Sequence, residues 1–125
     1  MILVDYEGLA QGYNPKVPEQ FRLPDEPTDS HIQVGDKDAK MVVNVDADRN
    51  IESIVITTDD DKIEGTYYKL FVDGLENGMG WSSGNFYNAA METLKDHQDH
   101  TGENSQGVKA EHHWEDNKMI VTVTK

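Results

Sequence analysis

The segment Gly80–Gly84 (GWSSG) has the G-x-S-x-G spacing of a turn that exposes a nucleophilic serine ahead of a helix. Asp96 or Asp99 and then His112 follow it, in the chain order that this kind of catalytic triad uses. Such a turn belongs to a large parallel sheet, which a chain of 125 residues with hairpin-like strands cannot supply. A serine or asparagine that caps helix amides beside glycines explains the same letters. We therefore predict that the chain is not an enzyme.

Four histidines could instead supply metal ligands. His97 and His100 lie three residues apart at a predicted helix end, and His112 and His113 lie on a predicted strand. Three imidazole nitrogens and a carboxylate would suit zinc, but neighbouring strand residues point to opposite faces, so only one of His112 and His113 can join. The helical wheel places His97 on the buried side, where a hydrogen-bonded core histidine is commoner. The metal candidates are thus His97, His100 and His112, and the preferred prediction is no metal and no cofactor.

Two aspartate-rich runs partly match cation-binding loops. Residues 46–50 (DADRN) begin as a calcium loop does, but Ile51 and Thr57 stand where glycine and a bidentate glutamate are needed. A hairpin turn is therefore favoured at 46–50. The run 59–61 (DDD) could hold a cation loosely, and otherwise forms an exposed acidic loop.

The predicted outer face of a helix carries acids at 92, 96, 99 and 103, spaced by four, three and four residues. If the helix continues past His97, these acids form one stripe about 16 Å long, given a rise of ~1.5 Å per residue. They crowd the C-terminal half, where the helix dipole disfavours each acid by roughly 0.3–1 kcal/mol. An arrangement that opposes local stability indicates another use, although an exposed helix face must be polar in any case.

The formal net charge is −13, from 24 acids against 11 lysines and arginines. Such a field repels phosphates and anionic lipids, so we expect no direct nucleic-acid or membrane binding and a basic protein surface as the partner. The alternative is that the acidity only aids solubility. The chain has no cysteine, which excludes disulfides and thiolate chemistry. Without a basic, apolar leader or a membrane-length apolar run, the expected location is cytoplasmic.

Apolar periodicity predicts the elements that hold these residues. Across a turn at 47–50, Met41, Val43 and Val45 are predicted to face Ile56, Ile54 and Glu52. Residues 66–72 are predicted to be a third strand, followed by a glycine-rich loop at 73–80. Residues 85–97 have the spacing of an amphipathic helix, with Gly102 as its stop.

The last hairpin is predicted residue by residue around a two-residue turn at Asp116 and Asn117. Its pairs are Glu115–Lys118, Trp114–Met119, His112–Val121 and Ala110–Val123. The apolar partners then share one face, which a slip of one residue would destroy. Residues 40–125 are therefore predicted to be an α+β core domain, in which an antiparallel sheet of about five strands (β-β-β-α-β-β) packs against one amphipathic helix.

Residues 1–39 are predicted to form a hairpin and a proline-rich arm. Ile2–Asp5 and Leu9–Tyr13 flank a short turn, and all four prolines lie between residues 14 and 39. The arm is expected to be extended, and either wraps over the domain or reaches a partner. Tyr13–Pro18 (YNPKVP) after the hairpin resembles short accessory proteins of bacterial viruses, a resemblance of six residues that implies no site.

The leading hypothesis is a non-enzymatic acidic protein that docks on a basic protein surface, in its sharpest form an inhibitor that mimics nucleic-acid charge. One alternative is a structural or adaptor component of a larger assembly such as a phage particle, forming homo-oligomers through the N-terminal arm. The other is a small histidine-based metal-binding domain. The residues predicted to contact a partner are Glu92, Asp96, Asp99, Glu103, Trp81, Asp59, Asp60 and Asp61.

Overall fold

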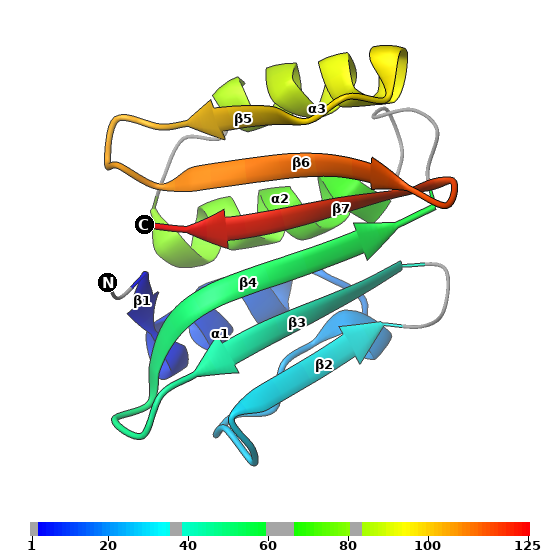
Figure 1. Cartoon of the computed structure of the whole chain (residues 1–125). Coiled ribbons are helices and arrows are strands. Elements are labelled where there is room, and N and C mark those ends of the chain that lie inside the picture. The colour runs from blue at the N-terminus through cyan, green and yellow to red at the C-terminus, as the bar shows by residue number, and fades with distance from the viewer. Residues whose placement is uncertain (1–2, 36–38, 60–66, 81–83) are drawn as a thin grey trace.

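The computed structural model describes residues 3–35, 39–59, 67–80 and 84–125 (Figure 1). In this part of the chain, seven strands form one antiparallel sheet in the order β2-β3-β4-β7-β6-β5, with the short β1 paired to β4. Three helices lie behind the sheet in the view of Figure 1, and the other face of the sheet is turned to the viewer. The α+β class is confirmed, whereas the predicted five strands and one helix are too few.

The elements follow one another in two groups along the chain. The first comprises β1 (Val4–Asp5), α1 (Tyr6–Tyr13), the 3-10 turns η1 (Asn14–Lys16) and η2 (Glu19–Phe21), β2 (His31–Gly35), β3 (Ala39–Val45) and β4 (Asn50–Thr58). The second comprises α2 (Tyr67–Met79), α3 (Gly84–Asp96), β5 (His100–Glu103), β6 (Lys109–Glu115) and β7 (Lys118–Thr124).

The β3–β4 hairpin has the predicted register along most of its length. Met41 faces Ile56 and Val43 faces Ile54, as expected. A bulge between Asn44 and Val45 then shifts the register, so that Val45 faces Ile51 rather than Glu52. The shift keeps the apolar Ile51 buried and leaves Glu52 in solvent.

Residues 46–50 form the turn of this hairpin, as predicted. Asp46 Oδ1 accepts hydrogen bonds from the amides of Asp48 (2.8 Å) and Asn50 (2.9 Å), and Arg49 adopts the left-handed region with φ 64°.

The β6–β7 hairpin confirms all four predicted pairs. Asp116 (φ 53°) and Asn117 (φ 63°) both adopt positive φ, as the two central residues of a type I′ turn must. Asp and Asn tolerate this region better than most residues, so the local sequence fixes both the turn and the register.

The predicted N-terminal hairpin is wrong, because residues 6–13 form α1. Asp5 caps this helix by accepting the Gly8 amide at 3.0 Å. Tyr6, Leu9 and Tyr13 are buried and lie three and four residues apart, which is the spacing of one helix face.

The predicted third strand and glycine-rich loop are also wrong for the described residues 67–79, which form α2. Tyr68, Phe71, Val72 and Leu75 are buried, and their spacing is helical rather than alternating. Two glycines of the expected loop, Gly74 and Gly78, are contact points with α1: a Cβ added to Gly78 would lie 2.8 Å from the carbonyl oxygen of Leu9.

The proline-rich segment packs against the sheet. Val17, Phe21 and Leu23 are buried in the same cluster as the apolar residues of β3, β4 and β7. The Asn14 side chain accepts the Leu23 amide (2.8 Å) and donates to the Leu23 carbonyl (2.9 Å), which holds the irregular chain in place. Residues 31–35, within the predicted arm, form the strand β2 and pair with β3.

Deletion of residues 1–39 is expected to unfold the remainder of the chain. The segment contributes eight large buried apolar residues, namely Tyr6, Leu9, Tyr13, Val17, Phe21, Leu23, Ile32 and Val34. Burial of each is worth about 1.5–3 kcal/mol, whereas a domain is stable by only about 5–15 kcal/mol in total. The measurement is urea unfolding followed by circular dichroism. A cooperative transition in the fragment 40–125 would instead show that residues 1–39 are a separable arm.

Gly12→Ala is expected to destabilise the protein by about 1–3 kcal/mol, because a new methyl group would overpack the contact between α1 and α2. A Cβ at Gly12 would lie 2.5 Å from the Cα of Gly78, which is backbone and cannot rotate away. The matched control is Gly84→Ala, where the new Cβ would meet no atom within 4 Å. Chemical denaturation should show a lower free energy of unfolding for Gly12→Ala than for Gly84→Ala and the wild type. Equal stability of the two variants would refute the close contact of Gly12 with Gly78.

Candidate protein-interaction surface

The predicted acidic stripe is not a single helical surface. Helix α3 ends at Asp96, and His97 adopts a positive φ of 58°, which turns the chain away from the helix axis. Asp99 therefore lies in the turn, and Glu103 lies on β5. Gly102, the predicted helix stop, lies on β5, where an added Cβ would be 2.6 Å from the Asn85 carbonyl oxygen on α3.

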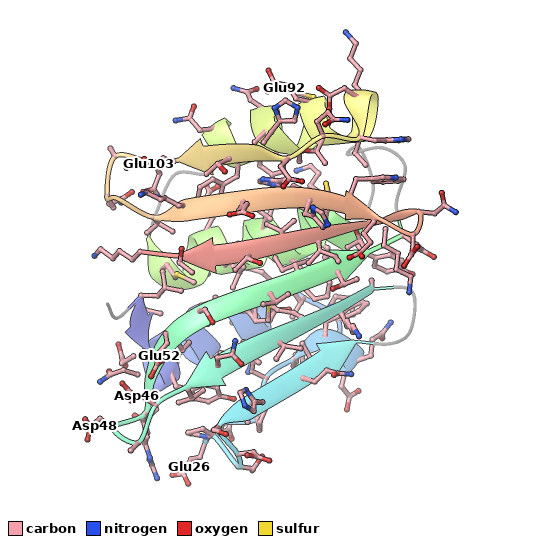
Figure 2. All side chains as sticks on the ribbon, viewed as in Figure 1. Glu26, Asp46, Asp48, Glu52, Glu92 and Glu103 are labelled. Carbon is pink, nitrogen blue, oxygen red and sulfur yellow. The ribbon has the colours of Figure 1, made fainter. Side chains whose placement is uncertain are left out.

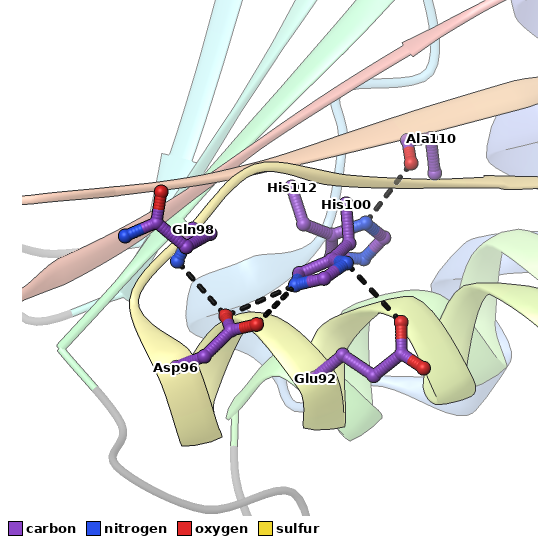
Figure 3. Close-up of polar contacts among 6 residues, drawn as sticks. All are labelled: Glu92, Asp96, Gln98, His100, Ala110 and His112. Atoms are coloured by element: carbon purple, nitrogen blue, oxygen red, sulfur yellow. Dashed lines mark hydrogen bonds and ion pairs between the residues drawn. The ribbon is translucent and has the colours of Figure 1, made fainter.

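His100 lies between the two acids that remain on the helix (Figure 3). Its Nδ1 is 3.2 Å from Glu92 and its Nε2 is 2.8 Å from Asp96. Both contacts are hydrogen bonds only when both ring nitrogens carry protons. Two hydrogen bonds lower the pKa of Asp96. The larger effect is that of the Gln98 backbone amide, and the smaller one is that of the His100 ring. Both acids near the helix C-terminus thus have a histidine neighbour within the chain.

The other two acids of the predicted stripe have neighbours on β6. Asp99 contacts Nδ1 of His113 at 2.6 Å, and this hydrogen bond raises the pKa of His113. Glu103 is paired with Lys109 in the strand register. The four acids are therefore distributed over a helix, a turn and a strand, and each has a basic or histidine neighbour.

His112 is buried in the core and hydrogen-bonded there, so the candidate metal ligands His97, His100 and His112 do not assemble. Its Nδ1 donates to the Ala110 carbonyl at 2.9 Å, which leaves Nε2 to accept from the Tyr68 hydroxyl at 2.8 Å. Burial lowers the pKa of His112 to about 4, so the ring is neutral near pH 7. His97 is exposed rather than buried, and its ring stacks on Trp114 with centroids 4.3 Å apart. Across the described ranges, no group of three or more His, Asp or Glu side chains could hold a metal ion.

Several predicted residues lie outside the described part of the chain. These are Trp81, Asp60 and Asp61, together with Ser82 and Ser83 of the G-x-S-x-G segment. Asp59 is described, and its side chain is exposed just after β4.

A second acidic surface, which sequence analysis missed, gathers at the end of the sheet that holds the β3–β4 turn. We call it the acidic end. It consists of Glu7, Asp25, Glu26, Asp29, Asp46, Asp48 and Glu52. Figure 2 shows the labelled residues Glu26, Asp46, Asp48 and Glu52 on this end, away from Glu92 and Glu103. No sequence spacing reveals it, because its members come from α1, from the segment before β2, and from the β3–β4 turn with the start of β4.

Arg49 is the basic residue at the centre of the acidic end. Its guanidinium lies 3.5 Å from Glu7 and 4.0 Å from Glu26, so it ties α1 to the segment before β2. Both contacts are exposed and therefore weak. Seven carboxylates against one arginine leave this end strongly negative.

Two shallow hollows flank Arg49. One, of about 440 Å³, is lined by 27–30, 45–47 and Arg49 itself. The other, of about 420 Å³, has Glu7, Asp25 and Glu26 in its lining. The acidic end is thus contoured, with carboxylates on the walls of both hollows.

Comparisons with known protein families, with curated proteins and with solved structures found no match for this chain. Among the helices of the described residues, none combines the length and the hydrophobicity needed to cross a membrane.

Acidification is expected to destabilise the fold through His112. Its pKa is about 4 in the folded protein, against an ordinary value of 6.5, so the unfolded chain takes up the proton first as the pH falls. The stabilisation is complete above pH 6.5 and is lost towards pH 4, by about 2 kcal/mol at pH 5. In urea unfolding at pH 7.5, His112→Phe should have a lower free energy of unfolding than the wild type. At pH 5 this difference between the two proteins should be smaller by about 2 kcal/mol. A difference that does not change with pH would contradict the lowered pKa of His112.

Proposed function

We propose that this protein is a non-enzymatic binding protein whose acidic end docks on a basic surface of another protein. The observation that carries the proposal is the gathering of seven carboxylates from three separate chain segments around Arg49. The fields of neighbouring carboxylates add over a surface of this size. A basic protein surface is the complementary partner.

The asymmetry between the two acidic surfaces supports the acidic end over the predicted stripe. In the predicted stripe, Glu92 and Asp96 contact His100, and Asp99 contacts His113. At the acidic end, Arg49 contacts Glu7 and Glu26, and no ion pair is formed by the other five acids with a described residue. Exposed carboxylates without an ion pair, such as Asp25 and Asp48, can exchange water for lysine or arginine without first breaking an ion pair.

The sharper form of the proposal is that the acidic end occupies the phosphate track of a nucleic-acid-binding protein. Proteins that bind nucleic acids carry clustered lysine and arginine side chains on one face. Carboxylates displayed on a contoured surface offer those side chains acceptors for charge-assisted hydrogen bonds. In this form the protein competes with nucleic acid because its carboxylates take the place of the phosphates.

Neutralising the acidic end is expected to weaken binding to a basic protein more than neutralising the stripe. The test compares Asp25→Asn/Glu26→Gln/Asp48→Asn with Glu92→Gln/Asp99→Asn/Glu103→Gln, because both triples remove three charges. The probe is a compact basic protein such as lysozyme, measured by calorimetry at low and moderate salt. We expect about a tenfold weakening for the first triple and a much smaller one for the second, and a steep loss of wild-type binding with salt.

Equal effects of the two triples would show that net charge alone drives the binding, and would refute a defined docking surface. A larger effect of the second triple would favour Glu92, Asp99 and Glu103 as the contact residues. Binding that does not change with salt would contradict both surfaces.

A further inference from the structure

The two edge strands of the sheet, β5 and β2, differ in whether a described helix packs along them. At one edge, α3 packs along β5, and the Asn85 side chain donates to the outward carbonyl of Glu103 at 2.7 Å. Gly102 lets the backbone of α3 approach closely at the same edge. At the other edge, β2 is hydrogen-bonded only to β3 among the described strands, and Figure 1 shows no described element beyond it.

Three residues of β2 turn their backbone N–H and C=O groups away from β3, towards the outer edge of the sheet. The Val45 amide donates to the Ser30 carbonyl at 2.8 Å, which makes Ser30 and Val45 a hydrogen-bonded pair. In an antiparallel ladder such pairs alternate, so Ile32 and Val34 also turn their backbone groups towards β3. The N–H and C=O groups of His31, Gln33 and Gly35 therefore point away from the sheet, ready to pair with another strand.

Charge distinguishes β2 from the other strands. Its sequence, HIQVG, contains no Asp, Glu, Lys or Arg, whereas each of the other described strands contains at least one. Exposed edge strands are commonly protected by charged side chains or by proline, and β2 has neither. In a chain of net charge −13, an uncharged edge is where a second acidic copy meets the least repulsion.

We propose that β2 pairs antiparallel with β2 of a second copy, around a twofold axis at Gln33, so that two sheets join into one. This register places Ile32 opposite Val34 on the helix-covered face, where both are apolar and buried. On the outer face, His31 lies opposite Gly35, which has no side chain to collide with the imidazole. The ring is held against its own sheet by a 2.5 Å contact of Nδ1 with Asn44 Oδ1.

The antiparallel direction also keeps the two acidic ends apart. The acidic end adjoins the first residue of β2, because Asp29, Ser30 and Asp46 line one hollow. In the paired strands, the acidic ends lie at opposite ends of the shared ladder. Five residues at ~3.3 Å each separate them by at least about 16 Å, compared with a Debye length of about 8 Å at physiological salt. A parallel pairing would place the acidic ends side by side.

The first test is the mass of the full chain in solution, measured by sedimentation across a range of concentrations and salt. A concentration-dependent dimer is expected, and it should strengthen with salt because salt screens the repulsion between copies. Gln33→Pro removes the central outward N–H without touching a β2–β3 hydrogen bond, and should give a folded monomer. The matched control, Gln33→Thr, retains the N–H and should still dimerise. A wild-type monomer under all conditions, or a dimer that persists in folded Gln33→Pro, would overturn the proposal.

A second variant tests the register independently. The chain has no cysteine, so Gln33→Cys introduces a single thiol. At the twofold axis the two Cα atoms would be ~5.5 Å apart, within the range that a disulfide spans. Oxidation should therefore yield a covalent dimer, whereas Thr122→Cys, on the outer face of β7, should remain monomeric. Equal cross-linking of both variants would refute the pairing through β2. Because none of these variants touches the acidic end, failure of the dimer would leave the docking proposal standing.

Discussion

The close contact between α1 and α2 sets the position of much of the remaining structure. The helices meet at Gly12 and Gly78, where a methyl group on either residue would strike backbone atoms of the other helix. Because they approach so closely, both helices fit on the same face of the sheet, and Tyr13 packs beside Gly74. Helix α1 then carries Glu7 to the β3–β4 turn, where Arg49 contacts it. The charged surface at this end thus depends on an uncharged helix contact.

The sequence predicts those parts of the fold whose information is local. The β6–β7 hairpin follows from the turn residues Asp116 and Asn117 and from simple alternation, and its register is correct throughout. Sequence reasoning misses helix α2 because it weighs aromatic and β-branched composition above periodicity, although Tyr68, Phe71 and Leu75 have helical spacing. Its glycines resemble loop residues because their partner, α1, is distant in the chain. Their role is visible only once tertiary contacts are known.

The candidate site is predicted less well than the fold, and for a similar reason. The expected stripe requires the helix to continue past His97, but that residue turns the chain, and β5 then pairs with β6. His100 and His113 come to lie beside the stripe's acids only through this pairing. The acidic end draws on three segments between residues 7 and 52, so no helical or alternating period connects its members. Charge density can be read from the sequence, but its grouping into a surface cannot.

Net negative charge limits which surfaces can bind this molecule, and the two proposed contacts depend on charge in opposite ways. The acidic end attracts a surface of opposite sign, whereas β2 presents backbone groups without charged side chains. Salt therefore weakens the first contact and strengthens the second, because it screens attraction in one case and repulsion in the other. Pairing centred on Gln33 leaves both acidic ends uncovered at the far ends of the joined strands. A paired molecule would then gain from bivalent binding only where a partner offers two basic patches at a matching separation, so geometry as well as charge would select the partner.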